Sequence, residues 1–244
     1  KGIIMPKSNE ENLPAVLDFS SDANKGFDSV EPSDFGVPIV KLLQKMSPAV
    51  DDVADAKPGD FYVGTTGQLW DGATGLLVIP CYYKKYYGVW TPRDMGGGFQ
   101  GELAVDDPLV REAKTVGMTK VLENGDELKE TVNWYLTIIN DLDNPIRVLF
   151  PMMSTQLRIS RKFISLSSGI KMKNAEGDLY TPPMFSHVYK IVSQQESNNK
   201  GTWYSMNLSV AGPVQDSGIY ETSKEFYSIA KNLGGSNLLS SPQE

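Results

Sequence analysis

The segment from residue 78 to residue 93, VIPCYYKKYYGVWTPR, places five aromatic side chains among three cations. Aromatic rings can stack on unpaired bases and cations can neutralise phosphates, a combination typical of proteins that hold single-stranded nucleic acid. The residues of this segment that we predict to contact nucleic acid are Tyr82, Tyr83, Lys84, Lys85, Tyr86, Tyr87, Trp90 and Arg93.

The segment reads as a β-strand, in which alternate side chains point to opposite faces. The two predicted faces are Tyr83, Lys85 and Tyr87 on one side and Tyr82, Lys84 and Tyr86 on the other. Because neither face is purely apolar, we expect at least one to be open to a ligand. The alternative is a half-buried strand whose tyrosines pack in a core while its lysines reach water.

A second basic block lies further along the chain. Residues 144–175 contain six Lys and Arg and no acid, in a chain whose net charge is -7. That net charge argues against a protein that coats duplex DNA by bulk charge, but a local basic groove can still form. We predict that Arg158, Arg161 and Lys162 contact phosphates. The alternative is a solvated helix face whose missing acids are supplied by neighbours in space.

Residues for catalysis or metal binding are scarce. His187 is the only histidine and lies in no nucleophile motif, and the single cysteine, Cys81, excludes a cysteine-based zinc site. The glycine-rich stretch at 94–101 lacks a phosphate-loop pattern. Carboxylates fall in turns and helix starts, where caps explain them. We therefore expect no enzyme, no catalytic residue, no cofactor and no metal; a hydrolase or nuclease that uses carboxylates and magnesium is the least favoured reading.

The elements that must position these residues are mostly strands in hairpins. We expect a loosely structured arm over 1–36, a single β-barrel domain over 37–232 and a flexible tail over 233–244. The predicted strands are 76–90, 129–140, 146–152, 180–192 and 202–210, and the predicted helices are 106–117, 155–168 and 221–232. This pattern predicts a mainly β fold: an OB-fold-like antiparallel barrel with a few short helices.

Five stretches together resemble the bacteriophage single-stranded DNA-binding proteins that are built on an OB-fold. They are VIPCYYKKYYGVW, WYLTIINDLDNPIRVLFPM, TQLRISRKF, SNNKGTWYSMNLSV and ETSKEFYSIAK, spread over residues 37–232. The resemblance implies a barrel of about five strands crossed on one face by nucleic acid. It also implies a protein that coats single-stranded DNA without strong sequence preference, during phage replication or recombination in the bacterial cytoplasm.

A different class of function fits the composition as well. An acidic β-rich chain with a loose arm suits a phage virion or assembly protein, whose tyrosines would anchor protein–protein contacts. The predicted partners are single-stranded DNA, with RNA not distinguished from it, and replication proteins; a homo-oligomer is left open. No apolar run approaches the length of a membrane span, so we expect no membrane partner.

Overall fold

The computed structural model describes residues 21, 25, 26, 36–199 and 201–233. The chain divides into two units, Lys1–Asp34 and Phe35–Glu244. Nearly all of the predicted N-terminal arm, and the predicted tail from residue 234 onward, lie outside the described residues. The elements below belong to the second unit.

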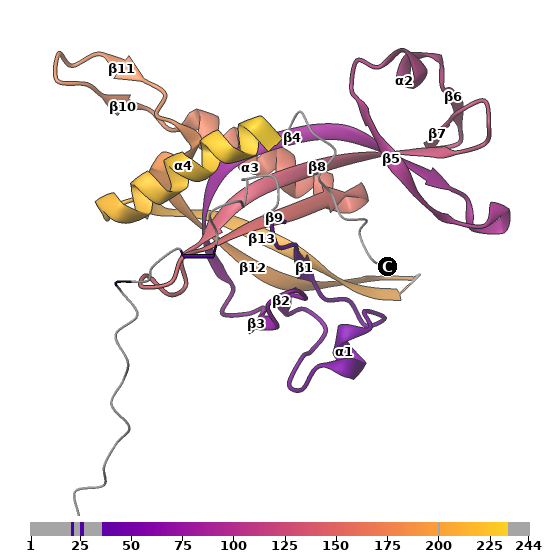
Figure 1. Ribbon diagram of the computed structural model, residues 1–244, viewed down its shortest axis with the longest axis horizontal. Helices are drawn as coiled ribbons and strands as arrows, with labels where there is room; N and C mark the ends of the chain where they lie inside the picture. Colours follow the sequence, from indigo (N-terminus) through magenta and orange to yellow (C-terminus); the bar gives the residue numbers. More distant parts are fainter. Residues whose placement is uncertain (1–20, 22–24, 27–35, 200, 234–244) are drawn as a thin grey trace, which may run out of the picture. The chain divides into compact units, whose positions relative to one another are not determined.

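The second unit is built on an antiparallel sheet that curls along its length (Figure 1). Its strands are β4 (Leu76–Thr91), β5 (Gly98–Ala104), β6 (Lys114–Val116), β7 (Thr119–Val121), β8 (Glu127–Ile138), β9 (Ile146–Met153), β12 (His187–Asn198) and β13 (Gly201–Pro213). Their order is β13–β12–β4–β8–β7–β6, with β5 paired to β4 and β9 paired to β8. The prediction of a mainly β, antiparallel fold with few helices is confirmed.

The long strand β4 is the centre of this sheet. Its apolar start is buried on both faces, with Val78 in one core and Ile79 in another. The pairing of β4 with β8 shifts register between Pro80 and Tyr82, which makes Cys81 an extra, bulged residue. A bulge suits a proline in a central strand because proline has no N–H for the ladder.

A small second sheet closes the open side of the curl. It consists of β1 (Val40–Leu42), β2 (Phe61–Val63) and β3 (Gln68–Trp70), with helix α1 (Ala49–Asp52) between the first two strands. Ile39 bridges to Leu149 of β9 at one end. At the other end the N–H of Ser193 in β12 donates to the Gly72 carbonyl at 2.7 Å. The enclosed space is the main hydrophobic core.

Helix α3 (Leu157–Gly169) packs into this main core, in agreement with the helix predicted over 155–168. Phe163 stacks on Trp134 of β8 with ring centroids 4.3 Å apart, and the Trp134 indole N–H donates to Ser160 Oγ at 2.9 Å. The helix contacts β13 as well as β8 and β9. It therefore links the two edge strands of the curl, β9 and β13.

Helix α4 (Ser217–Leu233) covers the opposite face of the sheet (Figure 1). Ile219, Phe226 and Ala230 are buried there in a second core with Ile79 and Tyr135. The helix starts four residues before the predicted start at Glu221, because Asp216 accepts the Ile219 N–H at 2.8 Å and caps the first turn.

The chain between β4 and β8 forms a lobe of its own, made of β5, β6, β7, helix α2 (Pro108–Glu112) and a 3-10 turn at Arg93–Met95. The helix predicted over 106–117 is wrong beyond Glu112, because residues 114–121 form the β6–β7 hairpin. Two further strands, β10 (Met172–Lys173) and β11 (Leu179–Tyr180), form a short projecting hairpin, and a 3-10 turn at Met184–Ser186 precedes β12.

The Phe163 stack provides a test of the core. Replacement Phe163→Ala removes a fully buried ring between Trp134 and Tyr189 and should lower the free energy of unfolding by about 3–5 kcal/mol. Urea unfolding followed by far-UV circular dichroism measures it. Arg161→Ala on the exposed side of the same helix is the control, and equal losses in the two variants would contradict the packing described here.

Candidate functional site

The predicted aromatic strand is covered on both faces. Tyr83 lies edge-on to Trp134, with centroids 5.2 Å apart, on the side of the main core. Tyr82 packs against Tyr135 and Tyr227 at 5.8 and 6.2 Å, on the side of α4. Tyr86 is only 5% exposed. Tyr86 is therefore closed to a ligand, whereas Tyr82 and Tyr83 pack against the cores with one part of each ring and stay half-buried.

The lysines of this strand are held by acids from neighbouring strands. Lys84 Nζ lies 2.9 Å from Glu102 of β5, and Lys85 Nζ lies 2.8 Å from Glu130 of β8. Burial, and secondarily the Glu102 carboxylate, raises the pKa of Tyr86 well above its usual range and the pKa of Tyr135 to about 12. Both phenols are thus neutral near pH 7. Tyr87 lies under Lys120, whose Nζ is 5.3 Å from its ring centroid.

Trp90 and Arg93, at the far end of the strand, line an open hollow. This loop hollow measures about 480 Å³ and lies between the start of the lobe and the start of β8. Its lining residues are Trp90, Thr91, Pro92, Arg93, Asp94, Gly98, Glu127, Lys129 and Met153. Lys129 Nζ lies 5.4 Å over the Trp90 ring, and Arg93 is exposed with no ion-pair partner among the described residues.

A second hollow lies beside the tip of the β12–β13 hairpin and measures about 590 Å³. This hairpin hollow is lined by Gln44, Met153, Thr155, Gln156, Asn198, Gly201, Thr202, Trp203 and Tyr204, none of which is charged. The Gln44 side chain fixes one wall, because its amide donates to the Tyr204 carbonyl at 3.0 Å and accepts the Tyr204 N–H at 2.9 Å.

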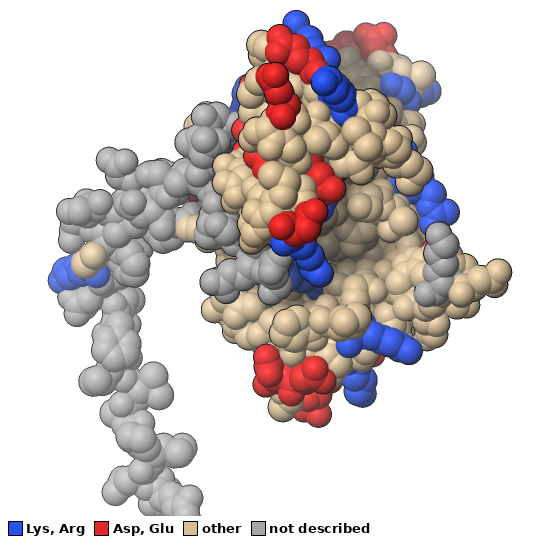
Figure 2. All heavy atoms as spheres, turned by 90° about the vertical axis from the view of Figure 1, so that its right-hand side faces the viewer, with Lys and Arg blue, Asp and Glu red and all other residues tan. Residues whose placement is uncertain are grey.

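Met153 lines both hollows, which are therefore neighbours, and we refer to the two together as the groove. Figure 2 views the molecule from the end where the β12–β13 tip lies and shows a deep hollow whose walls are largely uncharged, with Lys, Arg, Asp and Glu around it. The residue after Met153, Ser154, has a φ of 51°, which a non-glycine residue rarely adopts. Such backbone strain clusters at binding sites, where the surrounding structure enforces it.

The three predicted cations of the second basic block lie on the exposed side of α3, which begins directly after Gln156 of the hairpin hollow. Arg158 pairs loosely with Glu196 of β12 at 3.4 Å, and Lys162 donates to Asn207 of β13 at 3.0 Å. The Arg161 carbonyl accepts the Ser165 hydroxyl at 3.0 Å, and its guanidinium has no hydrogen bond or ion pair within the described parts of the chain. The block is therefore only partly neutralised by acids from elsewhere, Arg147 with Glu225 being the other pair.

The sequence predictions and the groove overlap only in part. Of the predicted residues, Trp90 and Arg93 line the groove, Arg158, Arg161 and Lys162 lie on the adjoining helix, and the six residues of 82–87 lie elsewhere. Gln44, Met153, Trp203 and Tyr204 were not among the predicted contacts. The aromatic pair Trp203–Tyr204 in a polar hairpin could have been predicted as a contact from the sequence, whereas no local pattern marks Gln44 or Met153.

The side chains that could serve metal or nucleophilic chemistry are dispersed or buried where the structure describes the chain. No group of three or more His, Cys, Asp or Glu lies together in these parts of the chain. His187 is buried, its Nδ1 lies 2.8 Å from Ser186 Oγ, and burial lowers its pKa. No helix among the described residues is long and apolar enough to span a membrane.

Comparison with known proteins gives one match. Residues 7–234 match the model of the Pam3 phage gp34-like protein family, which is nearly the whole chain. The chain belongs to this family. No curated protein matches, and no solved structure matches. Membership agrees with the predicted bacteriophage origin and leaves the roles in replication and recombination as proposals.

The packing of the Trp90 indole, which lines the loop hollow, can be tested by a substitution at Gly88. A Cβ added there would lie 2.9 Å from the Trp90 indole nitrogen, a buried donor with no acceptor among the described residues. Gly88→Ala should therefore push the indole off the strand and change the Trp90 fluorescence, with Trp90→Phe as the reference that assigns the change. The matched control is Gly101→Ala, where a Cβ meets nothing within 4 Å although its φ of 137° strains the backbone. An unchanged Trp90 signal in Gly88→Ala would contradict this packing.

Cys81 provides a test by pH. Burial raises the pKa of its thiol to about 11, above the value of an unfolded chain, so the thiol favours the folded state only while it is protonated. The contribution of the protonated thiol to the free energy of unfolding is complete below about pH 8, and it should fall by about 1–2 kcal/mol by pH 10. Urea unfolding of the wild type and of Cys81→Ser at both pH values isolates it, because other titrating groups are common to both proteins. A constant difference between the two proteins would be the contrary result.

Proposed function

We propose that this protein binds single-stranded DNA in the groove formed by the loop hollow and the hairpin hollow, as an OB-fold protein of a bacteriophage. The proposal rests on the order of the strands, on where the groove lies relative to them, and on the side chains that line it.

The chain order of the strands supports an OB-fold. β4, β8 and β9 form an antiparallel meander, α3 follows, and the β12–β13 hairpin returns so that β12 pairs with β4. The spatial order β9–β8–β4–β12–β13 leaves a gap between β9 and β13, and α3 contacts both strands. An OB-fold is a five-stranded, partly open Greek-key barrel, and the lobe then counts as an insertion between its first two strands.

The position of the groove is the observation that carries the proposal. The loop hollow is lined by the connection after β4, and the hairpin hollow by the β12–β13 hairpin; Met153, the last residue of β9, joins them. OB-folds bind oligonucleotides on the face of the second and third strands, between the loop that joins strands one and two and the loop that joins strands four and five. With β4 as the first strand, the groove lies between those two loops.

The lining suits bases inside and phosphates outside. Trp203, Tyr204 and Trp90 offer half-buried rings for stacking, and the side-chain amides and hydroxyls of the hairpin hollow can bond base edges. The cations that border the groove are Arg93, Lys129, Arg158, Arg161 and Lys162. A strand with its bases turned inward would leave its phosphates facing these side chains.

Binding is measured by fluorescence anisotropy of a labelled single strand of about 30 nucleotides, at two salt concentrations and with duplex DNA and single-stranded RNA as competitors. We expect strand-selective binding that weakens with salt, with a log–log slope of about 3 for four or five phosphate contacts. No binding at micromolar protein in low salt, or a flat salt response, would reject the proposal.

Variants then locate the site. Trp203→Ala and Trp90→Ala should each weaken binding by about 1–3 kcal/mol, the value of one stacked base. Arg161→Ala should reduce the salt slope by about 0.7, for one phosphate. Tyr180→Ala is the matched control, because this tyrosine is 43% exposed on β11 and lines neither hollow. A loss at Tyr180 equal to those at the two tryptophans would place the binding site elsewhere.

A role in virion assembly has one observation in its favour. The β10–β11 hairpin exposes Leu179, Tyr180 and Met172, which are side chains suited to a protein–protein contact. Sedimentation without DNA separates the two functions. Closed rings or larger assemblies that dissociate on Leu179→Ser would favour assembly, and a monomer or dimer would favour DNA binding.

A further inference from the structure

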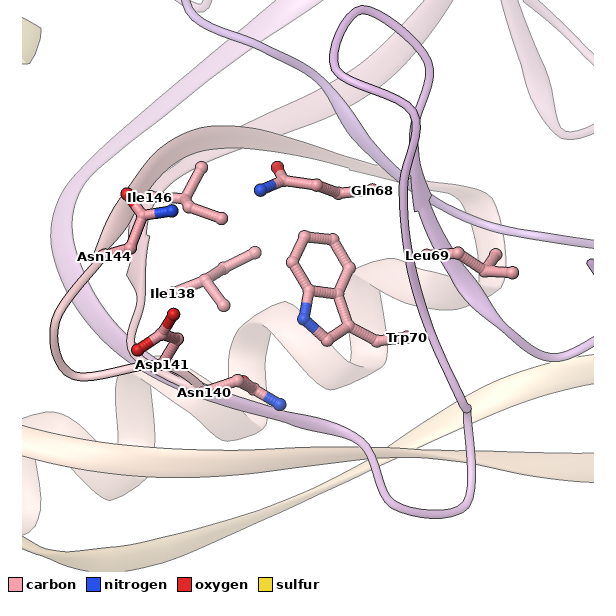
Figure 3. A pocket seen from close by; sticks show the side chains of 8 residues that line it. All are labelled: Gln68, Leu69, Trp70, Ile138, Asn140, Asp141, Asn144 and Ile146. Atoms are coloured by element: carbon pink, nitrogen blue, oxygen red, sulfur yellow. The ribbon is translucent and has the colours of Figure 1, made fainter. Parts of the chain in front are cut away.

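A separate pocket lies at the other end of β8, away from the residues of the groove. It measures about 310 Å³ and is lined by Gln68, Leu69, Trp70, Ile138, Asn140, Asp141, Asn144 and Ile146. Its walls come from β3 and from the turn between β8 and β9 (Figure 3). We refer to it as the indole pocket. The volume is at the lower end of the range for ligand sites, which fits a single ring system.

The frame of the indole pocket is rigid. Ile138 and Ile146 are paired residues of β8 and β9 and form its apolar part. The Asn140 amide is held at both ends, since its Oδ1 accepts the Leu77 N–H at 2.8 Å and its Nδ2 donates to the Gly75 carbonyl at 2.9 Å. The site is therefore preformed, and the cost of ordering it on binding is small.

Several polar groups in this frame have no partner among the described residues. Gln68 accepts from Thr66 with its Oε1 at 2.9 Å, which leaves its NH₂ group free. Asp141 accepts the Asp143 N–H with one oxygen at 3.1 Å, which leaves the other oxygen free. The Trp70 indole N–H and the Asn144 amide also lack a partner. Figure 3 shows Gln68, Trp70 and Asn144 directed into the pocket, whereas Leu69 points away.

The chemistry of this set selects the ligand. A flat indole face favours a flat ring, and the free amides offer donors to ring nitrogens and carbonyl oxygens. The free Asp141 oxygen can only accept a hydrogen bond, and carboxylates accept such a bond from the amino group of cytosine. The lining contains one carboxylate and no Lys or Arg, so a phosphate inside the pocket is disfavoured.

We propose that the indole pocket binds one unpaired nucleobase that carries an amino group, stacked on Trp70, with the amino group donating to Asp141 and ring acceptors receiving bonds from Asn144 or Gln68. Cytosine combines this donor and these acceptors on one edge, whereas thymine has no amino group. The inference goes beyond the proposed function by adding a second site, and it rests on that function in taking the base to belong to the bound strand.

The test uses nitrogen-15 spectra of the full chain, in which the four tryptophans give separate indole N–H signals. The signal of Trp70 is assigned with Trp70→Phe. Titration with 2′-deoxycytidine should shift the Trp70 signal. The affinity for thymidine, measured from the same signal, should be at least about tenfold lower. Trp134, buried against Phe163, is the internal control and should not move. Glucose and methylguanidinium are run in parallel as a neutral polyhydroxyl ring and a cation.

Asp141→Asn is the decisive variant. It keeps an oxygen for the Asp143 N–H but replaces the free acceptor with a donor, so affinity for deoxycytidine should fall about tenfold while the Trp134 signal stays in place. No Trp70 shift, an equal shift with thymidine, or a stronger response to glucose or methylguanidinium would overturn the proposal.

The two proposals fail separately. If the protein binds the labelled single strand but the Trp70 signal does not respond to deoxycytidine, the proposal of a base in the indole pocket is rejected and the proposal of binding in the groove stands. A Trp70 shift that is lost in Asp141→Asn, in a protein that does not bind the strand, supports the pocket and rejects the groove.

Discussion

The stacking of Phe163 on Trp134 is the contact on which the rest of the structure depends. Trp134 sits in the middle of β8, and its bond to Ser160 fixes the rotation of α3 as well as its position. With this rotation, Ile159 and Phe163 point into the core, and Arg158, Arg161 and Lys162 stay exposed. The same contact holds α3 against the two edge strands of the curled sheet, β9 and β13.

The sheet itself imposes a second constraint. Its central strand β4 carries a core on each face, so most of its tyrosines are used in packing and its lysines need acids as neighbours. Beyond both cores, at Trp90, the strand contributes an aromatic side chain to the lining of an open hollow. An aromatic and basic strand can therefore be both a folding element and, at one end, part of a site.

Local patterns in the sequence were enough for the main elements. Alternating and continuous apolar runs predicted β4, β8, β9 and the β12–β13 hairpin, and helical spacing predicted α3 and α4. The bounds predicted for β12, 180–192, were wrong: the strand starts at His187, after a 3-10 turn, and its polar second half continues to Asn198 because it pairs with β13. The helix predicted over 106–117 was wrong because Asp107 and Pro108 start a real helix that local sequence does not end, and the chain after Glu112 is held in a hairpin by its pairing with β8.

The site was harder to predict because it is assembled from distant segments. Which tyrosines of 82–87 face solvent depends on α4 and α3, which cover the sheet from far along the chain. The acids that pair Lys84 and Lys85 come from β5 and β8, outside the segment that looked basic. Gln44 reaches Tyr204 across 160 positions, a contact that no local pattern encodes.

That contact has a consequence for the sheet edge. β13 pairs with β12 on one side only, so the outward N–H and C=O of Tyr204 would otherwise be open to a strand from another molecule. The Gln44 side chain forms hydrogen bonds with both groups, as one peptide unit of a neighbouring strand would. A single amide thus protects this position of the edge from pairing with another chain, and it leaves the neighbouring ring of Trp203 half-buried.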